Sequence, residues 1–135
     1  MRRWLQVVLA VLGTLPIVTG VMAIAGGPAG MLDGQSTTST VDNEVRFLAV
    51  YWLAFGCVVW WLVPRVERAT TAYCAVLAVM FASGCARALS AALTGWPHPV
   101  IRAALFVELL APPILLWWQR SLTASSSLRE PTPTT

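Results

Sequence analysis

Two ionisable side chains lie deep inside apolar stretches of the sequence, where an isolated charge is costly. Glu108 sits in the run 100–119, in which Arg102 is the only other ionisable residue, and Arg87 interrupts the apolar run 70–93. A carboxylate in hydrocarbon needs a counter-charge, a proton or water. The fork of an arginine is the side chain that best matches a carboxylate. The sequence therefore predicts that Arg87 pairs with Glu108.

The depth of these residues suggests a shared polar site. At about 1.5 Å per helical residue, Arg87 lies roughly 9 Å and Glu108 roughly 13 Å below the outer ends of their runs. Arg46 lies near the outer mouth of another apolar run, and Tyr51 lies roughly 10 Å down it. We expect Arg46, Tyr51, Arg87 and Glu108 to line an outward-facing pocket. The alternative is that Arg87 and Glu108 are only a clamp that fixes two helices, because polar groups also hold membrane helices together.

Other chemistry finds little support in the sequence. It contains no H-E-x-x-H, no C-x-x-C and no phosphate-cradling glycine loop. One histidine, His98, cannot build a histidine-rich metal site. The cysteines at positions 57, 74 and 85 are interpreted as small packing residues. We expect no enzyme activity, no catalytic residue, no metal site and no cofactor.

Composition places the chain among integral membrane proteins. Of its 135 residues, 57% are hydrophobic and 11% are charged, against a charged share of about 25% in soluble domains. All nine basic residues are arginine, and they form no basic run. This distribution argues against a nucleic-acid surface.

Four apolar stretches, at about 4–25, 44–63, 70–93 and 100–118, are long enough to cross a bilayer. They predict an all-α integral membrane four-helix bundle over residues 1–120, followed by a disordered cytoplasmic tail at 121–135. Asp42 and Asn43 are the expected N-caps of the second helix. The small residues Gly84, Ala88 and Ala92 form a stripe that would let another helix approach closely.

The first stretch also has features of a signal peptide. Ala23-Ile24-Ala25 is an A-x-A sequence before Gly26. The uncharged run is longer than the h-region of about 7–15 residues that a signal peptide carries, which favours a retained helix.

The arginines predict the orientation of the helices. Three of the nine, Arg46, Arg87 and Arg102, lie within helices, and the other six flank one side of the bundle. Positively charged flanks stay in the cytoplasm, so both termini are expected there. We therefore expect a multi-pass protein of the inner (plasma) membrane whose surroundings are membrane lipids.

Several short motifs together resemble a family of small bacterial membrane proteins known as domain of unknown function 4345. The matching pieces are Asp42-Asn43-Glu44-Val45-Arg46-Phe47, Gly56, Gly84-Cys85-Ala86-Arg87, Gly95-Trp96-Pro97 and Glu108. They span the chain from about Gly26 to Arg120. The resemblance implies a four-helix membrane domain and supplies no activity.

Three functions fit these features. The first is a membrane protein whose polar pocket binds a small molecule or a lipid headgroup. The second is an accessory subunit that packs through its small-residue stripe against a membrane-protein partner or a second copy. The third is a small proton-coupled transporter in which Glu108 titrates.

Overall fold

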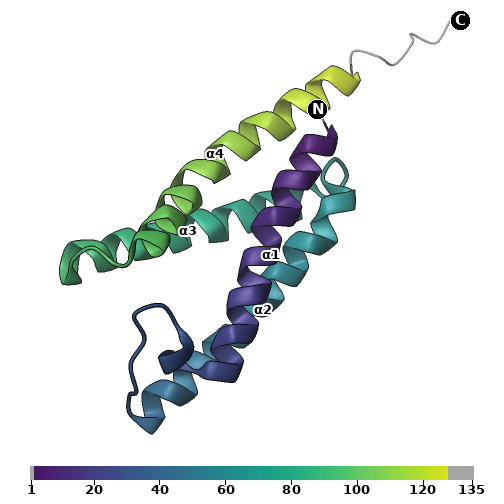
Figure 1. Ribbon diagram of the computed structural model, residues 1–135. Helices are drawn as coiled ribbons and strands as arrows, with labels where there is room; N and C mark the ends of the chain where they lie inside the picture. Colours follow the sequence, from purple (N-terminus) through teal and green to yellow (C-terminus); the bar gives the residue numbers. More distant parts are fainter. Residues whose placement is uncertain (1, 128–135) are drawn as a thin grey trace, which may run out of the picture. The chain divides into compact units, whose positions relative to one another are not determined.

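The computed structural model describes the backbone of residues 2–127 and the side chains of residues 3–121. Its four long helices are α1 (Arg2–Gly26), α2 (Ser39–Leu62), α3 (Thr70–Thr94) and α4 (Pro99–Ser127), with short 3₁₀ turns η1 (Pro28–Gly30) and η2 (Val63–Arg65) (Figure 1). The part of the chain that is described contains no strand. The all-α prediction is confirmed.

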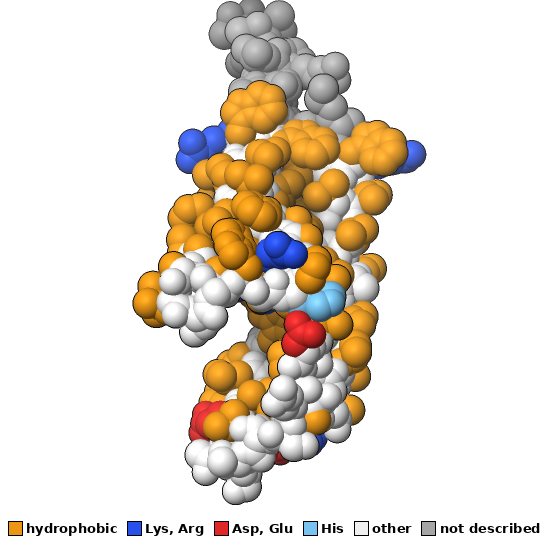
Figure 2. Space-filling view, turned by 60° about the vertical axis from the view of Figure 1, so that its left-hand side comes forward, with side chains coloured by type: hydrophobic (Ala, Val, Ile, Leu, Met, Phe, Trp, Pro, Cys, Tyr) orange, Lys and Arg blue, Asp and Glu red, His pale blue; other side chains and the backbone are white. Residues whose placement is uncertain are grey.

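Each long helix is long and apolar enough to cross a membrane. The four candidate spans are 23 to 27 residues long, and their mean hydropathy lies between 1.7 and 2.4. Figure 2 shows hydrophobic side chains over much of the surface turned to the viewer. Exposed apolar side chains all along a helix are typical of contact with lipid rather than water.

The second helix begins earlier than predicted. It starts at Ser39 rather than near Glu44, and its N-cap is Thr38, whose hydroxyl accepts a hydrogen bond from the Val41 N–H at 3.4 Å. The prediction that Asp42 and Asn43 are the N-caps was therefore wrong. Threonine caps a helix almost as well as aspartate or asparagine, so the first suitable hydroxyl along the chain can start the helix.

The fourth helix is longer than predicted. It continues to Ser127, into the segment expected to be disordered, while residues 128–135 lie outside the described residues. The sequence from Arg120 to Ser127 contains no glycine or proline to end a helix. Pro112 and Pro113 lie inside α4 without ending it, as membrane helices commonly allow.

The chain divides into two compact units, each described here by itself. One consists of residues 1–6 and 65–135, and the other of residues 7–64. In the first unit α3 packs against α4. A Cβ added to Gly84 would lie 3.0 Å from Leu109 Cδ2 and 3.1 Å from the Glu108 carbonyl carbon, so the two helices approach closely there. Gly84 is the first residue of the predicted small-residue stripe and is buried at this contact. Ala92 is the last residue of the stripe and is exposed.

In the second unit α1 and α2 meet through glycines. A Cβ added to Gly56 would lie 2.6 Å from Ile17 Cγ1 and 2.8 Å from the Gly13 carbonyl oxygen. A Cβ added to Gly20 would lie 3.0 Å from the Leu53 nitrogen. Small residues at such contacts let helix backbones pack directly against each other.

Indole hydrogen bonds also join α1 to α2. Trp52 Nε1 donates to Thr19 Oγ1 at 2.8 Å, and Trp60 Nε1 donates to Thr14 Oγ1 at 3.2 Å. Each of these threonine hydroxyls donates in turn to the carbonyl four residues earlier in α1. The tryptophan N–H groups therefore find partners within the hairpin, as polar groups in an apolar medium must.

The cysteines do not all pack in the interior. Cys57 and Cys85 are exposed, and Cys74 is half-buried. The interpretation of all three as packing residues was wrong for the first two. Cys57 and Cys85 lie on exposed parts of their helices, and a residue's type does not reveal which face of a helix it occupies.

One buried hydroxyl ties the two helices of the first unit together. Tyr73 is fully buried, and its hydroxyl donates to the Leu115 carbonyl at 3.0 Å. We expect Tyr73→Phe to destabilise this unit by about 1 kcal/mol, the usual worth of such a bond. Tyr51→Phe is the matched control, because Tyr51 is 61% exposed. Unfolding of both variants in detergent checks this, and equal stability would contradict it.

Candidate functional site

The predicted ion pair forms in the first unit. Arg87 Nε on α3 donates to Glu108 Oε2 on α4 at 2.8 Å. The Glu108 side chain is 8% exposed, and that of Arg87 is 32% exposed. The pairing predicted from depth and chemistry is confirmed.

Close helix packing places the two charged residues within reach of each other. Gly84 lies three residues before Arg87 and lets α3 approach the backbone of Glu108. Pro112 in α4 has no N–H to donate to the carbonyl of Glu108, the bond an ordinary residue would make four positions on. The helices are therefore in close contact at the level where α4 carries both its buried carboxylate and a carbonyl without its usual helical hydrogen bond.

Arg87 is only partly satisfied by this pair. A guanidinium has five N–H donors, and Nε supplies the one bond to Glu108. Its two terminal nitrogens have no hydrogen-bond partner among the described residues of the chain. One edge of the guanidinium is therefore fixed, and the terminal nitrogens keep donors free for another acceptor.

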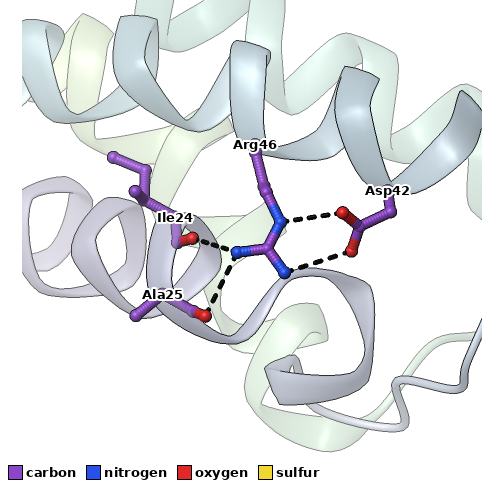
Figure 3. A network of polar contacts seen from close by, with 4 residues as sticks. All are labelled: Ile24, Ala25, Asp42 and Arg46. Carbon is purple, nitrogen blue, oxygen red and sulfur yellow. Dashed lines mark hydrogen bonds and ion pairs between the residues drawn. The ribbon is translucent and has the colours of Figure 1, made fainter. Parts of the chain in front are cut away.

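Arg46 has a different role. Its Nε and Nη2 donate to Asp42 Oδ2 and Oδ1 at 2.8 and 3.3 Å, and its Nη1 donates to the carbonyls of Ile24 and Ala25 (Figure 3). The last carbonyls of a helix lack intrahelical partners, and a cation beside them is favourable. Arg46 is thus a cap for the end of α1, and most of its donors are used.

Gly27 makes this cap possible. Its φ of 58° lies in the left-handed region, and its N–H donates to the Ala23 carbonyl at 2.9 Å. An added Cβ would collide with the Asp42 carboxylate and lie 2.8 Å from Arg46 Nη2. Neither the cap formed by Arg46 nor the role of Gly27 was predicted from the sequence. The available signals were a glycine after the last apolar residues of a helix and an aspartate four residues before an arginine.

Tyr51 is exposed on α2, where its ring makes an edge contact with Phe47 at 5.1 Å between centroids. Tyr51 and Arg46 belong to the unit of residues 7–64, and Arg87 and Glu108 belong to the other. The structure thus confirms one pair and gives Arg46 a capping role. A single pocket lined by all four residues stays a prediction.

Comparison with known proteins gives a family without an activity. No curated protein and no solved structure matches the chain. One family model covers residues 4–119, which include all of α2 and α3, nearly all of α1, and α4 as far as Gln119. The chain belongs to the family described as Domain of unknown function (DUF4345).

Proposed function

We propose that this chain is a non-enzymatic, multi-pass membrane protein that binds an anionic oxygen group through Arg87. The group is the phosphate of a lipid headgroup or the phosphate or carboxylate of a small molecule. The observation that carries the proposal is the guanidinium of Arg87, which has one of its five N–H donors bonded to the buried carboxylate of Glu108. The clamp alternative needs only the bond to Glu108, and it leaves the terminal nitrogens without a role.

The geometry suits an oxygen ligand near the membrane surface. Arg87 lies seven residues before Thr94, the end of α3, or about 10 Å along the helix axis. A long arginine side chain can direct its charged end toward the headgroup region. Two terminal nitrogens in one plane match two phosphate or carboxylate oxygens. Glu108 meanwhile holds the Nε edge and fixes the orientation of the guanidinium.

Native mass spectrometry of the protein released from phospholipid nanodiscs tests this site. We expect Arg87→Gln to reduce retained phospholipid about ten-fold relative to the unchanged protein, the loss expected for one or two charge-assisted bonds. Arg87→Lys should retain an intermediate amount, since it keeps the charge and loses the fork.

Arg102→Gln is the matched control, because Arg102 is an exposed arginine near the start of α4. It should leave the retained lipid unchanged. Equal retention in all four proteins would refute the lipid-phosphate proposal. Recovery of a stoichiometric protein partner in place of lipid would instead support the accessory-subunit function.

The orientation of the helices is part of the proposal. We infer an inner-membrane protein with both termini in the cytoplasm, because arginines at the start of α1, in the connection between α2 and α3 and near the end of α4 would all flank the same side of the membrane. At the C-terminus, a reporter that works in the cytoplasm should be active. At Ser36, a reporter that works outside the cytoplasm should be active. Activity of both reporters on the same side would show that four spans are not present.

A further inference from the structure

The connection between α1 and α2 borders an open polar hollow on the surface of its unit. It has a volume of about 460 Å³ and lies in the unit of residues 7–64. On the connection, η1 contacts α2, and Figure 1 shows the loop that follows it. Its polar lining consists of Gln35, Ser36, Thr37, Ser39, Asp42 and Arg46. Its volume falls in the range of about 300–1,000 Å³ usual for small-molecule sites.

The lining places donors and acceptors side by side. Arg46 has four of its five N–H groups in the bonds described above, which leaves one on Nη2. Each Asp42 oxygen accepts one bond from Arg46 and keeps a further lone pair. The hydroxyls of Ser36, Thr37 and Ser39 can each donate and accept, and none has a partner among the described residues. A ligand hydroxyl can satisfy a neighbouring donor and acceptor at the same time.

The charge of the lining selects against ions. Asp42 and Arg46 neutralise each other, and the other lining residues are uncharged. An anion would meet the Asp42 carboxylate, and a cation would meet the Arg46 guanidinium. The lining residues also include no aromatic or large aliphatic side chain that would favour an apolar ligand.

We propose that this hollow binds a neutral polyhydroxylated group of the monosaccharide class, either as a free sugar or as the headgroup of a glycolipid. The ligand hydroxyls would bridge Arg46 Nη2 and Asp42 and contact the hydroxyls of the loop. This site is separate in its residues and in its ligand chemistry from the one at Arg87.

The test uses the full chain in phosphatidylcholine nanodiscs. One set of discs contains monoglucosyl diacylglycerol, a second contains plain diacylglycerol, and a third receives free glucose. Native mass spectrometry and calorimetry measure binding in each. Binding of the glucosyl lipid but not of diacylglycerol or glucose supports the headgroup as ligand, and binding of glucose supports the free sugar.

Thr37→Val removes a lining hydroxyl and leaves the Arg46 cap and the Thr38 N-cap in place. We expect it to weaken binding about five- to ten-fold, the loss of one hydrogen bond. Thr40→Val is the matched control, since Thr40 lies nearby in the first turn of α2 and does not line the hollow. The proposal is overturned if neither monoglucosyl diacylglycerol nor free glucose binds. It is also overturned if Thr37→Val and Thr40→Val weaken binding equally.

Discussion

Replacing Glu108 with glutamine should destabilise the unit formed by α3 and α4 by about 3–5 kcal/mol, because it leaves a guanidinium without its counter-charge. The Arg87 side chain is 32% exposed and that of Glu108 is 8% exposed, so water reaches the remaining guanidinium in part and the loss should fall at the lower end of this range. Glutamine keeps the shape and one acceptor oxygen. The measured loss therefore reports the charge. Reversible unfolding in mixed detergent micelles provides the measurement.

A double-mutant cycle separates direct pairing from two independent effects. Arg87→Gln should also destabilise, and the combination with Glu108→Gln should recover part of the loss, since no charge is then left unpaired. Strict additivity of the two changes would contradict the bond between Nε and Oε2. If the double variant retains the same amount of lipid as the unchanged protein, the pair is only a clamp and the proposed binding role is wrong.

Gly56→Ala should destabilise the α1–α2 hairpin by about 1–3 kcal/mol, the usual cost of overpacking. The new methyl would lie 2.8 Å from the Gly13 carbonyl oxygen, which belongs to the backbone and cannot rotate away. The two helices would have to separate, which would also lengthen the bonds from the two tryptophans to the threonines.

The matched control for this change is Gly26→Ala at the end of α1. A Cβ there meets no atom within 4 Å. Alanine is favoured over glycine in helices by roughly 0.5–1 kcal/mol, so the control should be neutral or slightly stabilising. The opposite signs of the two changes are the diagnostic result. Similar thermal unfolding temperatures for both variants would show that α1 and α2 do not pack through Gly56.

The features that the sequence predicted well follow from short-range rules. Four apolar runs of bilayer length predict four helices, because the requirement is one of length and composition. The pairing of Arg87 with Glu108 follows from helical rise and the cost of a lone charge in an apolar medium. Gly84 appeared in the predicted stripe because small residues mark close helix contacts.

The features that were missed depend on geometry between distant residues. The cap formed by Arg46 requires a left-handed turn at Gly27 and acceptors that are 21 and 22 residues away. The start of α2 was misplaced because several hydroxyls between Ser36 and Thr40 could each serve as the N-cap. Local propensity cannot choose between such equivalent positions.

The cap on α1 also bears on how this segment would be processed. The bond after Ala25 is the one a signal peptidase would cut at the A-x-A sequence, and α1 is helical through Gly26. The Ala25 carbonyl accepts a hydrogen bond from Arg46, so this peptide unit is held by a residue of the next helix. A peptidase needs a locally unfolded segment, and opening this one means breaking the cap. We therefore expect the cap to hinder cleavage at this sequence once α2 has folded, so that α1 is retained; a mature chain whose mass lacks residues 1–25 would contradict this.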